Sequence, residues 1–116
     1  MTRILLVEDE TAILDTQAEL LRYAGFEVIA TTSATEALTI LENEQIDVLF
    51  SDIRLGRESG LELAYMTHRD HPEVAVVLTT GYSGGKGEIR WPLLMKPYLC
   101  EQAVALINKT LTKRET

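Results

Sequence analysis

The sequence has few of the features that typify disulfide-stabilised or membrane proteins. It contains one cysteine, Cys100, which excludes an internal disulfide and a cysteine-based metal cluster. No apolar run approaches the roughly 20 residues needed to span a bilayer. Met1, Thr2 and Arg3 lead directly into an apolar strand, without the hydrophobic core of a signal peptide. We therefore expect a cytoplasmic protein with no membrane insertion.

Basic residues are also scarce. The chain has 11 Lys and Arg against 18 Asp and Glu, which gives a formal net charge of -7. Direct nucleic-acid binding needs clustered Lys and Arg at the phosphates, so this balance argues against it and suits a protein that holds a cation. The 116 residues, 46% of them hydrophobic, are enough for one domain with its own core, and we expect a single domain over residues 1–116.

Apolar segments of strand length alternate with amphipathic segments of helix length. This rhythm is typical of βα repeats that build a parallel sheet, and continuous apolar strands indicate that both faces of the sheet are covered. A capping-box pattern, Ser33 to Glu36, predicts the start of one helix, and Ser59 to Glu62 predicts another. We predict strands over residues 4–7, 26–30, 47–52, 74–78 and 93–95, and helices over 11–24, from 34 to 43, from 59 to 71 and after 97.

The segment between residues 80 and 92 breaks this rhythm. It holds Gly81, Gly84, Gly85 and Gly87 where a fourth helix is expected, and each helical glycine costs about 1 kcal/mol relative to alanine. We therefore predict a short or disordered fourth helix, and a segment over 81–91 that becomes ordered on activation.

Charged and polar residues follow the predicted strands. Asp52 ends an apolar strand expected to be buried, where an unpaired carboxylate would cost several kcal/mol, so a cation is expected to meet it. Another strand leads into Glu8 and Asp9, a third into Thr80, and the last into Lys96. Converging acids of this kind need an ammonium group or a hard divalent cation such as Mg²⁺, and the set as a whole suits phosphoryl transfer.

Taken singly, these motifs have ordinary explanations. Glu8 and Asp9 alone would be a solvated acidic turn, and Lys96 alone a surface lysine. Thr80 could simply satisfy a turn backbone. A nucleotide-binding P-loop around Lys86 is rejected, because Gly87 stands where Ser or Thr is required.

In combination and in this order, the motifs resemble the receiver domain of two-component response regulators over essentially the full chain. The resemblance implies a flavodoxin-like (βα)5 fold, a doubly wound parallel sheet with strand order 2-1-3-4-5. The residues that carry it are Glu8, Asp9, Asp52, Leu55, Gly60, Thr80, Lys96 and Pro97.

This resemblance implies a chemistry. Asp52 would take a phosphoryl group from a partner histidine, with Thr80 and Lys96 assisting. Glu8, Asp9, Asp52 and the main-chain carbonyl of Arg54 would bind Mg²⁺ or Mn²⁺. The partner would be a histidine kinase or a histidine phosphotransfer protein, and a weak dimer is left open.

The sequence also departs from the family pattern. Gly56 stands where proline is usual, which should loosen the loop after Asp52, and Leu93 replaces a common switch aromatic. Bulky Arg54 and Tyr82 should make self-dephosphorylation slow. Two alternatives stay open: a degenerate receiver that docks partners without phosphorylation, and a small phosphatase, which would lack a second acid to activate water.

Overall fold

A computed structural model describes residues 1–81 and 89–115, and these build a five-stranded, wholly parallel sheet in the order β2-β1-β3-β6-β7. The predicted strand order is therefore confirmed. The register places Val7 beside Ser51 and Asp52 beside Thr79, so neighbouring strands end at nearly the same level. The strands are β1 Arg3–Val7, β2 Glu27–Thr31, β3 Val48–Asp52, β6 Ala75–Thr80 and β7 Leu93–Met95.

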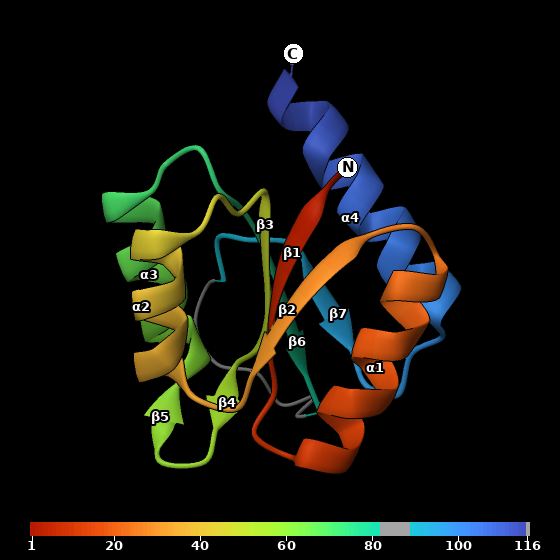
Figure 1. The fold of residues 1–116 in the computed structure, drawn as a ribbon, viewed down its shortest axis with the longest axis horizontal. Coiled ribbons are helices and arrows are strands. Elements are labelled where there is room, and N and C mark those ends of the chain that lie inside the picture. Colours follow the sequence, from red (N-terminus) through yellow and green to blue (C-terminus); the bar gives the residue numbers. More distant parts are fainter. Residues whose placement is uncertain (82–88, 116) are drawn as a thin grey trace.

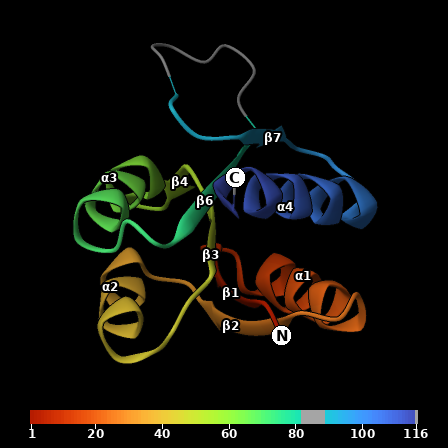
Figure 2. The same ribbon diagram turned by 90° about the horizontal axis from the view of Figure 1, so that it is seen from above.

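Helices cover both faces of this sheet (Figures 1 and 2). On one face α1 (Thr11–Tyr23) and α4 (Cys100–Glu115) pack over a buried cluster that includes Phe50 and Ile107. On the other face α2 (Ala34–Asn43) and α3 (Gly60–Asp70) enclose a second cluster that includes Leu49. The central strands are buried on both faces, which explains why their sequences are continuously apolar rather than alternating.

Local signals in the sequence explain where the helices end. Gly25 follows α1 with a φ of +106°, and the N–H of Phe26 donates to the carbonyl of Leu21 at 3.2 Å, as in a Schellman cap. The hydroxyl of Ser33 caps α2 by accepting from the N–H of Glu36 at 3.2 Å. In a full capping box the Glu36 carboxylate would accept from the N–H of Ser33. Here it accepts from the hydroxyl of Thr31 instead.

The segment after Asp52 is more regular than the predicted loop. It forms a two-stranded antiparallel hairpin, β4 (Arg54–Leu55) and β5 (Glu58–Ser59), closed by a two-residue turn. Gly56 is the first turn residue and has a φ of +63°, a conformation that L-residues rarely adopt. Gly56 therefore makes a tight turn, and the expectation that it loosens the loop is wrong.

Three smaller outcomes concern the C-terminal half. Strand β6 continues to Thr80, two residues beyond the predicted end, because it pairs with β7 there. The last helix is expected after residue 97, but α4 begins at Cys100, and Leu99 just before it is 63% exposed. The predicted fourth helix and the proposed ordering of 81–91 fall mainly on residues 82–88, outside the part of the chain that the structure describes.

Candidate functional site

The strand ends bring the predicted site residues to one edge of the sheet. Because Val7 lies beside Ser51, Glu8 follows β1 at the level of Asp52, the last residue of β3. Thr80 ends the next strand, and Lys96 directly follows β7. Four separate segments of the chain thus deliver acids, a hydroxyl and an amine to the same edge.

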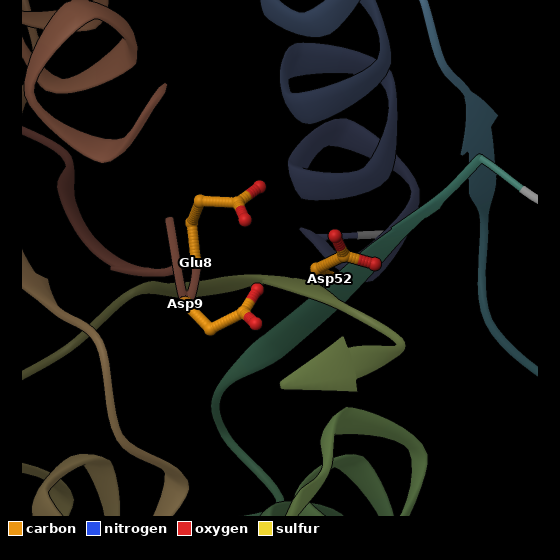
Figure 3. A group of neighbouring side chains, drawn as sticks. All are labelled: Glu8, Asp9 and Asp52. Atoms are coloured by element: carbon orange, nitrogen blue, oxygen red, sulfur yellow. The ribbon is translucent and has the colours of Figure 1, made fainter. Parts of the chain in front are cut away.

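Three carboxylates meet there. Glu8, Asp9 and Asp52 each offer one oxygen, and these oxygens lie within 4.8 Å of one another. Figure 3 shows the carboxylates of Glu8 and Asp9 extending toward the side on which Asp52 lies. Such an all-oxygen, acidic donor set fits Mg²⁺ or Mn²⁺, which prefer hard ligands and use one or two carboxylates alongside phosphate and water.

Lys96 joins two of these acids. Its Nζ donates to Glu8 Oε1 at 2.8 Å and to Asp52 Oδ2 at 2.6 Å. Its backbone N–H donates to the carbonyl of Thr80 at 2.8 Å, which fixes the chain just after β7 beside the end of β6. The lysine therefore supplies the cation that a carboxylate at the end of a buried strand requires.

The pKa values of both Glu8 and Lys96 lie above their ordinary values. Desolvation raises the pKa of Glu8, an effect that the hydrogen bond from Lys96 opposes. Partial burial alone would lower the pKa of Lys96, but its hydrogen bonds to Asp52 and Glu8 outweigh burial and raise it above the ordinary value of 10.5. Lys96 is thus held in its charged form at neutral pH.

The remaining predicted residues lie at the same edge. Thr80 is buried at the end of β6, one residue beyond the strand partner of Asp52. The N–H of Arg54 donates to Asp52 Oδ1 at 3.2 Å, so the chain turns back over the phosphoacceptor candidate. The predicted role of the Arg54 carbonyl as a metal ligand stays a prediction.

The site also explains the glycine eight residues after Asp52. A Cβ on Gly60 would lie 1.8 Å from the carbonyl oxygen of Asp52 and 3.0 Å from the hydroxyl of Ser51. The N–H of Gly60 also donates to the carbonyl of Ile53 at 2.7 Å. Only glycine therefore allows the start of α3 to pass this close beneath Asp52.

Sequence reasoning missed two residues near the site. Tyr98 donates its hydroxyl to Gln17, and burial raises its pKa to about 12. Glu58 binds the start of α2 through its carboxylate. Both contacts join residues far apart in the chain, so no local pattern could have indicated them, although Tyr98 directly follows the Lys96-Pro97 motif.

The doubly wound sheet and its acidic, lysine-bridged edge define a receiver-type domain, and comparison with known proteins agrees. The model of the response regulator receiver domain family matches residues 4–90. The chain belongs to this family, whose members are the receiver domains of two-component systems.

Individual relatives and solved structures support this assignment. The chain is 40% identical over 81 residues to the alginate biosynthesis transcriptional regulatory protein AlgB of Pseudomonas putida, covering 70% of this chain and 18% of that protein. A CheY-like receiver domain from Methanospirillum hungatei JF-1 is 30% identical with a TM-score of 0.88, covering 99% of this chain and 97% of that one. TrrA of Thermotoga maritima, solved in complex with Mg(2+)-BeF, is 25% identical with a TM-score of 0.86, covering 95% and 99% of the two chains.

The chain spans 18% of the length of the AlgB relative, so the activity and partners of such a whole protein are not carried over. Within residues 1–81 and 89–115, none of the helices is long and apolar enough to cross a membrane.

Proposed function

We propose that Asp52 is the phosphoacceptor of a phosphorelay. A carboxylate oxygen of Asp52 attacks the phosphorus of a phosphohistidine on the partner, a P–O bond forms, and the P–N bond breaks. The imidazole nitrogen leaves with the bonding electron pair, and an aspartyl-phosphate results. The observation that carries this proposal is the position of Asp52, bonded to Lys96 at 2.6 Å and facing Glu8 and Asp9.

A divalent metal ion fits the same arrangement. Glu8, Asp9 and Asp52 would hold Mg²⁺ or Mn²⁺, with the carbonyl of Arg54 proposed as a further ligand. Such an ion would neutralise negative charge on the phosphoryl oxygens beside these acids. The solved complex of TrrA with Mg(2+)-BeF supports a metal at this class of site.

Two further side chains would stabilise the transferred group. The ammonium of Lys96, which bonds Asp52, would donate a hydrogen bond to a phosphoryl oxygen. This hydrogen bond would strengthen as negative charge develops on that oxygen. Thr80 would add a hydroxyl donor from the end of β6. In this scheme catalysis consists of positioning and charge neutralisation, because the chain brings these groups together before the phosphoryl group arrives.

The partner follows from this chemistry. A phosphoryl group on a histidine is carried by a histidine kinase or a histidine phosphotransfer protein, and we propose one of these as the donor. Self-dephosphorylation is proposed to be slow, because Arg54 and Tyr82 would crowd an attacking water. Tyr82 lies outside the described residues, so this part of the proposal rests on the sequence.

A second candidate is a docking module that is not phosphorylated. The observation that favours it is the closed set of ion pairs, since Lys96 already satisfies both Glu8 and Asp52. In that case the ion pairs of Lys96 with Glu8 and Asp52 would only stabilise the fold.

Incubation with Mg²⁺ and a small acyl phosphate, followed by intact-mass measurement, separates the candidates. A phosphoacceptor gains the mass of one phosphoryl group in a metal-dependent way, and Asp52→Asn removes the gain. A docking module gains nothing, and a phosphatase consumes the acyl phosphate without lasting mass gain. Labelling of Asp52→Asn at the wild-type rate would overturn the assignment.

A further inference from the structure

The end of β2 and the first turn of α2 contact the two segments of the chain that build the site. On one side, the N–H of Glu8 donates to the carbonyl of Thr31 at 3.2 Å, just before α2 begins. The hydroxyl of Thr31 accepts from the N–H of Ser33 at 3.2 Å, so this turn is tied to the acidic segment. The position of Glu8 is thus linked to the start of α2.

On the other side, Glu58 reaches across from the hairpin after Asp52. Its Oε1 accepts from the N–H of Ala34 at 2.8 Å. Its Oε2 accepts from the N–H of Thr35 at 3.1 Å and from the hydroxyl of Thr35 at 2.6 Å. Both carboxylate oxygens are therefore used, and the residues joined are 23 and 24 positions apart in the chain.

The hydrogen bonds from Ala34 and Thr35 favour the negatively charged form of the Glu58 carboxylate. The first N–H groups of a helix lack partners within the helix and carry a partial positive charge, so a carboxylate binds them well. The hydroxyl of Thr35 and these amides lower the pKa of Glu58. Ser33 caps the helix by accepting from the N–H of Glu36, and its side chain adds a weaker hydrogen bond to Glu58.

The hairpin that Glu58 anchors is part of the site. Glu58 pairs with Leu55, and the pair beside it joins Ser59 to Arg54, whose N–H donates to Asp52. The turn at Gly56 lies against the acidic segment, since a Cβ there would be 3.7 Å from Asp9 Oδ2. A shift of this hairpin would therefore move the backbone beside both Asp52 and Asp9.

We propose that Glu58 is a positioning residue for the metal site. By binding the first turn of α2, Glu58 fixes the position of the β4–β5 hairpin relative to the segment that carries Glu8 and Asp9. This inference rests on the proposed function, because it assigns Glu58 an effect on the binding of a divalent ion to the acids of that site. Glu58 itself does not touch the ion.

The test compares Glu58→Gln with two matched controls. Glu62→Gln makes the same chemical change on the same groove between α2 and α3, but the described hydrogen bonds of the α2 N-terminus go to Glu58 and not to Glu62. Ser33→Ala removes the cap of α2 and the weaker side-chain bond to Glu58, while it leaves the bonds from Ala34 and Thr35 to Glu58 in place. Two quantities are measured on each purified full-length chain: amide exchange of residues 54–59 in EDTA, and the Mg²⁺ dissociation constant by calorimetric titration.

Glu58→Gln should speed hairpin exchange and weaken Mg²⁺ binding by about tenfold, the size of effect typical of groups that support metal ligands. Neither Glu62→Gln nor Ser33→Ala should both speed hairpin exchange and weaken Mg²⁺ binding. Thr35→Val, which removes a hydroxyl while it keeps the side-chain shape, should weaken Mg²⁺ binding less, and should add little to Glu58→Gln because both changes remove the same contact.

The outcomes separate this inference from the proposed function. If wild type binds Mg²⁺ and Glu58→Gln binds it equally well, the positioning role is wrong and the phosphoacceptor proposal stands. If Ser33→Ala weakens binding as much as Glu58→Gln, the stability of α2 explains the effect and the positioning role is again wrong. If wild type itself binds no Mg²⁺ or Mn²⁺, the proposed function fails.

Discussion

Gly60 lies so close to Asp52 that a Cβ on Gly60 would be 1.8 Å from the Asp52 carbonyl oxygen and 2.8 Å from its carbonyl carbon. Contacts this short involve backbone atoms, which cannot rotate away as a side chain can. The start of α3 and the end of β3 are therefore packed backbone against backbone directly beneath the proposed phosphoacceptor.

The first prediction follows from this contact. Gly60→Ala should lower the free energy of unfolding by about 1–3 kcal/mol, the usual cost of overpacking, and should slow phosphorylation because Asp52 must shift. Urea unfolding and the rate of mass gain measure the two effects. Gly81→Ala is the control for stability, since a Cβ there would meet nothing within 4 Å among residues 1–81 and 89–115. Equal stability of the two variants would contradict this account of Gly60.

A second prediction concerns Lys96. Lys96→Met leaves the buried Glu8 and half-buried Asp52 facing each other without their shared cation, so stability in EDTA should fall by about 1–3 kcal/mol. Added Mg²⁺ should restore part of the loss, because an ion that binds the folded state stabilises it. Thermal unfolding measures both, with Lys109→Met on exposed α4 surface as the matched control. If both lysine variants lose the same stability, the ion pairs of Lys96 are unimportant.

A third prediction ranks the two neighbouring acids. Asp9→Ala should weaken Mg²⁺ binding more than Glu8→Ala, because Asp9 is exposed and available to the ion whereas Glu8 already bonds Lys96 at 2.8 Å. Calorimetric titration of both variants gives the ranking, and Asp15→Ala on the exposed side of α1 controls for the general loss of an acidic charge. Equal losses would contradict the ranking.

A fourth prediction concerns pH and Tyr98. Burial raises the pKa of Tyr98 from its ordinary value of 10.0 to about 12, so folding favours the neutral phenol. Its contribution to stability is fully present below pH 10.0 and is lost as the pH rises through about 12. Tyrosinate absorbance should show a late component that Tyr98→Phe removes and Tyr23→Phe leaves. Loss of that component in Tyr23→Phe would contradict the assignment to Tyr98.

Most of the fold follows from local patterns. The central strands β1, β3 and β6 are mostly apolar, and Gly25 and Ser33 fix helix ends by local chemistry, so the sequence predicts these elements well. The predicted strand ends at residue 78, two residues before β6 does, because pairing with β7 extends β6 to Thr80 and such pairing is not visible in either segment alone. The hairpin around Gly56 was missed for a similar reason: two strands of two residues carry no hydrophobic periodicity.

The site was predictable where a residue ends a strand. Asp52, Thr80 and Lys96 each follow an apolar run, and the strand order that the family resemblance implies brings them together. Glu58 gave no such signal, since its carboxylate acts on Ala34 and Thr35 across a groove that only the packing of α2 beside the hairpin creates. Contacts of this kind depend on tertiary placement, which the spacing of residues does not encode.

The central claim, that Asp52 receives the phosphoryl group, is tested most directly by locating the modification. The chain is treated with a small acyl phosphate and Mg²⁺, reduced with borohydride, digested, and mapped by peptide mass spectrometry. Borohydride converts an aspartyl-phosphate to homoserine, so the account predicts homoserine at residue 52, and none there when EDTA replaces Mg²⁺. Homoserine at another aspartate with residue 52 unchanged, or no conversion in any peptide, would contradict it.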